Sequence, residues 1–234
     1  MANKKLQTGT TKGQRVAIWA ILILTIGSTI ALYFSMFLGQ KNQIAEHKAY
    51  QENQKKYQDD YKKYQDKLDQ QAKKLSDIYY AEFSQYKNRV AAFNSTDAEK
   101  AGVKTEDLKV GSGAEINYSS IKYTAYYIGW KPDGTVFDGS IDGEKLKNPL
   151  FVEKQGDKWQ MIEGWTEGVK GMKVGGIREI SIPSAKAYGQ AGSPNQTDPA
   201  KSIAPSESIR FVVMIIPDTE AITPPNPADY GLGA

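Results

Sequence analysis

The chain of 234 residues is long enough for one large domain or for a small domain with appended segments. From residue 94 onward it has 15 Lys and Arg against 19 Asp and Glu, so no basic surface for nucleic acid is indicated there. The absence of cysteine excludes disulfides and thiolate chemistry. The single histidine, His47, is far in sequence from the motifs described below, which excludes a Ser-His-Asp triad there.

An uncharged apolar run occupies residues 16–38, after a basic segment at 1–15. As a helix the run would extend roughly 35 Å, enough for a bilayer core of about 30 Å. A cleaved signal peptide is the main alternative, but its apolar region is usually shorter and no typical cleavage site follows. The sequence therefore predicts a transmembrane helix at 16–38, with 1–15 as a cytoplasmic tail. The predicted localisation is a single-pass anchor in the cytoplasmic membrane, with the remaining chain extracytoplasmic.

Residues 40–93 are polar and contain neither glycine nor proline. Acidic and basic side chains recur four residues apart, which favours a solvated helix. Tyrosines, leucines and phenylalanines at a three-and-four spacing form a heptad-like seam. Two alternatives remain open: a coiled-coil-like stalk, which would allow a homodimer, or a helix whose latter half packs on the globular part. We favour a helical stalk at 39–93, followed by a linker at 94–102.

The globular part is expected at residues 103–217. Tyr123, Ala125 and Tyr127 alternate with other residues, which indicates a half-buried strand with its apolar face on the odd numbers. Residues 209–216 form a nearly continuous apolar strand. Several strands with one short helix predict an α+β domain. The proline-rich tail at 218–234 has too few apolar residues to fold alone and is predicted to be disordered.

One stretch, residues 161–189, carries the most specific pattern in the chain. Its Trp165 begins a short helix that glycines weaken, so packing must hold that helix in place. The stretch resembles the signature of the FKBP family of peptidyl-prolyl cis/trans isomerases. The matching positions are Gly164-Trp165, Gly168, Gly171-Met172, Gly175, Ile180, Ile182-Pro183 and Ala187-Tyr188-Gly189.

The resemblance extends over residues 108–216 and implies a twisted antiparallel sheet wrapped on a short helix, with a hydrophobic pocket lined by aromatic side chains. It implies no cofactor and no metal. The residues carried over as catalytic are Tyr127, Phe137, Asp138, Trp165 and Tyr188. Those carried over as substrate-binding are Leu150, Met161, Ile162, Ile203 and Phe211. The chain departs from the family pattern at Ser193, where many relatives have His, and in a longer loop at 192–202.

The function implied is prolyl isomerisation that assists the folding of exported or cell-surface proteins. Rotation about an X-Pro bond needs no covalent nucleophile, and a dry aromatic pocket can favour the twisted state over the planar one. The expected partners are proline-containing polypeptide substrates and FK506-like macrolide inhibitors, with no nucleic acid. The alternative is a non-catalytic module that binds proline-containing peptides, or a chaperone or assembly module, tethered to the membrane.

Overall fold

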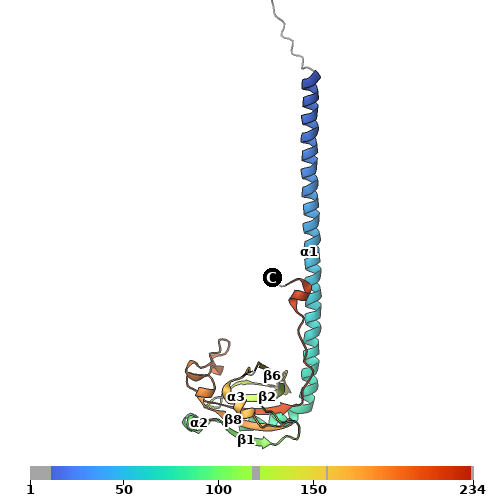
Figure 1. Ribbon diagram of the computed structural model, residues 1–234. Helices are drawn as coiled ribbons and strands as arrows, with labels where there is room; N and C mark the ends of the chain where they lie inside the picture. Colours follow the sequence, from blue (N-terminus) through green and yellow to red (C-terminus); the bar gives the residue numbers. More distant parts are fainter. Residues whose placement is uncertain (1–11, 118–121, 157, 233–234) are drawn as a thin grey trace, which may run out of the picture. The chain divides into compact units, whose positions relative to one another are not determined.

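The computed structural model describes residues 12–117, 122–156 and 158–232 (Figure 1). Side chains are not described for residues 12–23, 42 and 159. The chain divides into two units, Met1–Lys62 with Pro224–Ala234, and Lys63–Thr223. A long helix, α1 (Lys12–Phe83), begins in the first unit and ends in the second. The domain boundaries expected from the sequence stay predictions.

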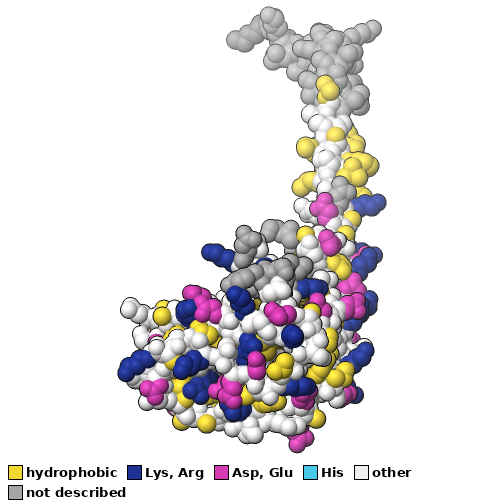
Figure 2. Space-filling model, turned by 60° about the horizontal axis from the view of Figure 1, so that its bottom comes forward, with side chains coloured by type: hydrophobic (Ala, Val, Ile, Leu, Met, Phe, Trp, Pro, Cys, Tyr) yellow, Lys and Arg dark blue, Asp and Glu magenta, His cyan; other side chains and the backbone are white. Residues whose placement is uncertain are grey.

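In the first unit, a C-terminal segment contacts α1. The 3-10 helix η5 (Pro227–Tyr230) ends on Tyr230, whose hydroxyl donates to Asp60 Oδ2 at 2.7 Å. The Tyr230 ring meets Tyr57 edge-on, with 5.5 Å between ring centroids. The η5 part of the proline-rich tail therefore contacts the helix in this unit. Large apolar side chains between residues 24 and 38 are exposed (Figure 2).

The predicted transmembrane helix at 16–38 requires a correction. Within the described part of the chain, no helix is both long and apolar enough to cross a membrane. The predicted single-pass placement in the cytoplasmic membrane is therefore wrong on this finding. Residues 1–11 of the predicted cytoplasmic tail lie outside the described residues.

The second unit is built on an antiparallel sheet, as the resemblance implies. Its strand order is β1 (Lys104–Lys109), β8 (Ile177–Ile182), β9 (Ile209–Ile216), β2 (Lys122–Trp130), β6 (Leu150–Gln155) and β7 (Lys158–Trp159). The short β3 (Val136–Gly139) also pairs with β2. A separate hairpin joins β4 (Ile141–Asp142) and β5 (Lys145–Leu146).

The helix α3 (Glu163–Val169) covers one face of this sheet (Figure 1). It lies close to β8 because two of its residues are glycines. A Cβ atom at Gly164 would come within 2.2 Å of Ile182 Cγ2, and one at Gly168 within 2.4 Å of Ile180 Cγ2. The glycines weaken the helix intrinsically, but they permit the close packing that holds it.

The other face of the sheet is covered as well, by the end of the long helix α1. In β2, Tyr126, Ile128 and Trp130 are buried on the face opposite α3. They pack with Leu75 and Phe83 from the end of α1. The end of α1 therefore lies on the sheet, as in the second of the two alternatives left open for the helix. Pairing of two chains through residues 39–93 stays a prediction.

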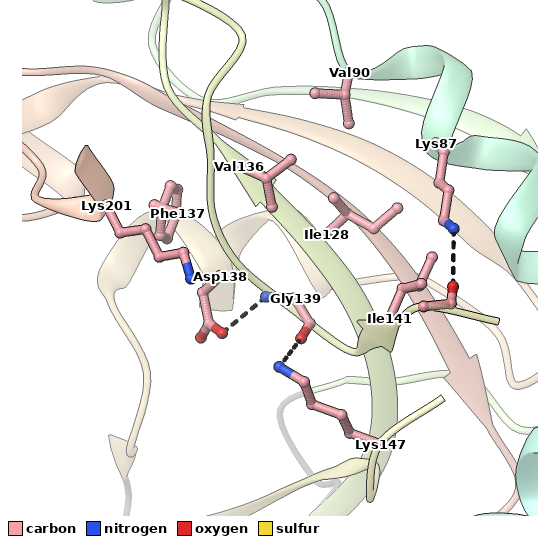
Figure 3. A pocket seen from close by; sticks show the side chains of 11 residues that line it. Lys87, Val90, Ile128, Val136, Phe137, Asp138, Gly139, Ile141, Lys147 and Lys201 are labelled. Carbon is pink, nitrogen blue, oxygen red and sulfur yellow. Dashed lines mark hydrogen bonds between the residues drawn. The ribbon is translucent and has the colours of Figure 1, made fainter. Parts of the chain in front are cut away.

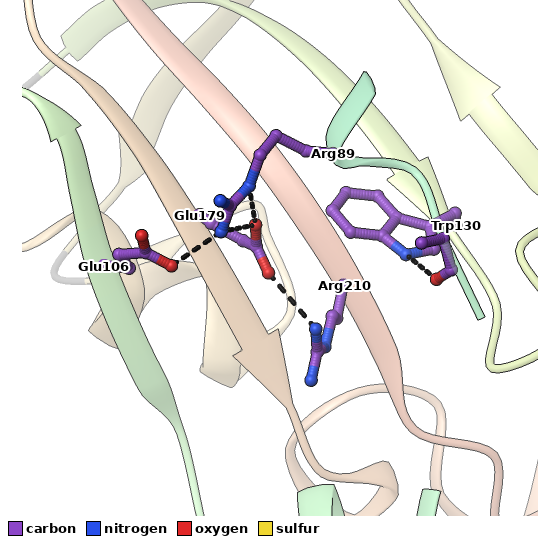
Figure 4. A network of polar contacts seen from close by, with 6 residues as sticks. Arg89, Glu106, Trp130, Glu179 and Arg210 are labelled. Carbon is purple, nitrogen blue, oxygen red and sulfur yellow. Dashed lines mark hydrogen bonds and ion pairs between the residues drawn. The ribbon is translucent and has the colours of Figure 1, made fainter. Parts of the chain in front are cut away.

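A buried carboxylate anchors the segment that follows α1 (Figure 4). Arg89, in the 3-10 helix η1 (Ser84–Arg89), donates from Nε to Glu179 Oε2 at 2.7 Å and from Nη2 to Glu106 Oε2 at 2.6 Å. Arg210 donates to the other oxygen of Glu179 at 3.3 Å, and its guanidinium lies 4.4 Å from the centre of the Phe93 ring. A buried carboxylate is tolerated when it is paired in this way, so Glu179 fixes η1 against β8 and β9.

We expect Phe83→Ala to lower the free energy of unfolding by about 3–5 kcal/mol, because the fully buried ring packs on Tyr126 and its loss leaves a cavity. Urea denaturation of the intact chain, followed by tryptophan fluorescence, measures the change. Ile78→Ala is the matched control, since Ile78 is 56% exposed on the same helix and should change stability by less than about 1 kcal/mol. Equal effects of the two substitutions would contradict the packing of α1 on the sheet.

Candidate functional site

A cavity of about 450 Å³ opens in the second unit between β2, β3, β6 and α3. Nine of the ten residues that the resemblance implies for the site line it. The lining consists of Tyr127, Phe137, Asp138, Leu150, Gln160, Met161, Ile162, Trp165, Tyr188 and Phe211. The tenth, Ile203, is buried in the adjoining hydrophobic core and does not line the cavity.

Trp165 lines the cavity and is fully buried. It meets two rings edge-on, with centroid distances of 5.0 Å to Phe211 and 5.6 Å to Tyr127. Its indole N–H donates to the hydroxyl of Tyr123 at 2.7 Å. This hydrogen bond fixes the orientation of the indole and satisfies its one polar group, which burial would otherwise penalise.

Phe137 forms a side of the cavity from β3, and its ring lies 5.6 Å from that of Phe211. The two rings meet over Gly129 of β2. A Cβ atom at that position would be 2.6 Å from Phe211 Cε1 and 2.7 Å from Phe137 Cζ. The glycine two residues after Tyr127 is therefore required for space, so that these rings can close over the strand.

The polar groups of the cavity centre on Asp138. Its Oδ2 accepts a hydrogen bond from the Tyr127 hydroxyl at 2.5 Å, and its Oδ1 accepts from the backbone N–H of Gly139 at 2.8 Å. Burial raises the pKa of the Tyr127 phenol, and the hydrogen bond to Asp138 raises it further. Burial and then the Asp138 charge raise the pKa of Tyr188 above its usual value. Both phenols therefore keep their protons at neutral pH, while Asp138 is held in one orientation.

The long loop after Tyr188 is closed by paired backbone hydrogen bonds. Ser193 N–H donates to Ile203 O at 2.8 Å, and Ile203 N–H donates to Ser193 O at 2.9 Å. These bonds place Ile203 in the core, so its expected role in substrate binding stays a prediction without support from its position.

Two residues of the site were missed from the sequence. Gln160 lines the cavity directly before Met161, and only its neighbour in the chain could have drawn attention to it. Tyr123 supports Trp165 from below the cavity, and the signal available was its place on the inward face of β2. Within the described ranges, no group of three or more His, Asp or Glu side chains is arranged to hold a metal ion.

Comparison with known proteins gives consistent matches. Residues 113–216 match a family model described as FKBP-type peptidyl-prolyl cis-trans isomerase. An FK506-binding protein of Neisseria meningitidis serogroup B is 40% identical over 92 residues, which cover 39% of this chain and 79% of the relative. A 46 kDa FK506-binding nuclear protein of Spodoptera frugiperda is 39% identical over 102 residues, or 44% of this chain and 23% of the relative. A solved structure titled AtFKBP13 is 29% identical, covers 52% of this chain and 96% of its own, and has a TM-score of 0.42.

We expect Tyr123→Phe to destabilise the chain by about 1–3 kcal/mol, because it leaves the buried indole N–H of Trp165 without its acceptor. Urea denaturation measures the change. Tyr126→Phe is the matched control on the same strand. The buried Tyr126 hydroxyl has no hydrogen-bond partner among the described residues, so its removal should be neutral or stabilising. If Tyr126→Phe cost as much as Tyr123→Phe, the hydrogen bond would not explain the effect.

Proposed function

The chain belongs to the FKBP-type peptidyl-prolyl cis-trans isomerase family, and from this premise we propose that the cavity above Trp165 is where an X-Pro bond is isomerised. The observation that carries the proposal is the set of rings around Trp165, with one oriented carboxylate at its edge. The proposed catalytic residues are Tyr127, Phe137, Asp138, Trp165 and Tyr188. The proposed substrate contacts are Leu150, Met161, Ile162 and Phe211.

The chemistry fits a site of this kind. Rotation about a peptide bond has a barrier of about 18–20 kcal/mol, because amide resonance is lost on twisting. The planar amide is charge-separated and well solvated, whereas the twisted amide is less polar. A pocket that surrounds the proline with rings and excludes water therefore binds the twisted state better than the planar one. No covalent intermediate is required.

The polar groups have separate proposed tasks. Tyr188 keeps its proton because the pKa of its phenol is raised, so it can donate a hydrogen bond to a substrate carbonyl. Asp138 is oriented by Tyr127 and Gly139, which places a negative charge beside the rotating bond. An oriented charge costs little reorganisation during the reaction.

The proposed substrates are proline-containing polypeptides. A role with exported or cell-surface proteins rested on the membrane anchor, and it loses that support with the correction above. We further propose that FK506-like macrolides occupy the same cavity and compete with the substrate, since curated relatives carry the name FK506-binding protein.

We expect Asp138→Asn and Phe137→Ala each to lower kcat/KM on a proline-containing peptide by about tenfold or more, a loss of about 1.4 kcal/mol or more in transition-state stabilisation. A protease-coupled isomerisation assay on the intact chain measures the rate, and circular dichroism checks folding. Lys104→Ala, an exposed change on β1, is the control and should leave the rate unchanged. A folded wild-type chain that binds the peptide without accelerating isomerisation would favour the non-catalytic alternative.

We also expect kcat/KM on a capped peptide without ionisable groups to be constant from about pH 7 to about pH 9.5. Loss of the proton from Tyr127 would remove the donor to Asp138, but the raised pKa of that phenol moves this loss above its ordinary value near 10. The pKa of Tyr188 is also raised, so this phenol likewise keeps its proton over that pH range. A fall in rate below about pH 9.5 that disappears in Tyr127→Phe or Tyr188→Phe would contradict this assignment.

A further inference from the structure

A second cavity, of about 550 Å³, adjoins the first and shares Phe137 and Asp138 with it (Figure 3). Its apolar lining comes from Val90, Ile128, Val136 and Ile141. The proposed isomerase site uses Phe137 and Asp138 of β3, and residues of the same short strand line this second cavity. A peptide bound in the first cavity therefore has neighbouring residues within reach of the second.

Three lysines line the second cavity, each from a different segment (Figure 3). Lys87 belongs to η1, Lys147 directly follows β5, and Lys201 ends the 3-10 helix η4 (Pro199–Lys201). The chain from residue 94 onward has more acids than bases, so this local excess of positive charge does not follow from overall composition.

Two of these ammonium groups form hydrogen bonds to backbone carbonyls, and Lys87 Nζ also lies 5.8 Å from the centre of the Tyr80 ring. Lys87 Nζ donates to Gly143 O at 3.3 Å, and Lys147 Nζ donates to Gly139 O at 3.0 Å. In the part of the chain that the structure describes, neither lies within ion-pair distance of a carboxylate. An ammonium group has three donors, so each retains donors for a ligand. Lys201 is different, since it pairs with Asp198 at 3.4 Å.

Asp138 is the one carboxylate among the residues that line the second cavity. Its two oxygens already accept hydrogen bonds from Tyr127 and Gly139. It therefore offsets one positive charge and leaves an excess of positive charge around an apolar lining. An aliphatic side chain that ends in a carboxylate matches that combination.

Part of this cavity comes from outside the region that matches the family. Lys87 and Val90 precede residue 113, where the family match begins. They are held over the sheet because Arg89, between them, is bonded to Glu179 and Glu106. The cavity thus depends on the segment that follows the long helix of this chain.

We propose that the second cavity binds the carboxylate side chain of a Glu or Asp residue near the proline of the substrate. The proposal rests on the proposed isomerase function and specifies its substrate class. An extended peptide advances about 3.3 Å per residue, so the three residues on either side of the proline reach about 10 Å from it. The carboxylate reaches Lys87 and Lys147, and the methylene groups of Glu pack on Val136 and Ile141.

The experiment compares capped peptides that carry Glu or Gln at each of three positions on either side of one proline. For the intact chain at about 20 mM salt, we expect kcat/KM for the Glu peptide to exceed that for the Gln peptide by about threefold to tenfold at one position at least. The ratio should fall towards one at about 500 mM salt, because exposed ion pairs are screened. A Glu-to-Gln ratio near one at every position would overturn the proposal.

The variants use the same ratio, so any change in the overall rate cancels. The double variant Lys87→Gln with Lys147→Gln should bring the ratio to about one, and Lys147→Glu should make the Gln peptide the better substrate. Lys145→Gln is the matched control, because Lys145 pairs with Asp142 and does not line the cavity, so the wild-type ratio should persist. A wild-type ratio in the double variant would overturn the assignment to these lysines.

The outcomes also separate this proposal from the one on which it rests. If the intact chain accelerates neither peptide, the isomerase function fails. If it accelerates Glu and Gln peptides equally, the function stands and the acidic preference is wrong.

Discussion

The pairing of β2 with β9 is the constraint on which the rest of the second unit depends. Its register sets Tyr127 opposite Val213 and Gly129 opposite Phe211. Side chains alternate across a strand, so Tyr127 and Phe211 reach the cavity while Tyr126 and Val212 lie under the end of α1. A slip of one residue in this pairing would exchange the two faces of the strand. The rings that line the cavity would then point towards the end of α1. The cavity and the helix contact are thus fixed by one set of backbone hydrogen bonds.

The candidate site could be predicted from the sequence because its requirements are local. Gly164 and Gly168 let α3 approach β8, and Gly129 leaves room for two rings. Such positions admit no larger side chain, so they give a spacing that can be recognised without a structure. Nine of the ten expected residues line one cavity for this reason. Ile203 does not line the cavity, because its backbone pairing with Ser193 places it in the core. No pattern in the loop sequence predicts that pairing.

The covering of the second face of the sheet is one of two alternatives that the sequence leaves open. The tyrosines and leucines after residue 40 have the spacing of a paired helix, and the same spacing suits packing on a sheet. Long-range contacts decide between these two arrangements. Phe83 packs on Tyr126, and Arg89 is bonded to Glu179, which lies 90 residues further along the chain. The membrane prediction is wrong for a different reason, because no helix among the described residues is both long and apolar enough to cross a membrane.

The segment after α1 distinguishes the second cavity from the first. The rings around Trp165 all come from the family-matched region, residues 113–216. Lys87 and Val90, which line the second cavity, precede that region. The charge of the neighbouring cavity can therefore change without disturbing the register of β2 and β9 or the packing of Trp165. In the proposed mechanism, selectivity for the residues around the proline is therefore separable from the isomerisation itself.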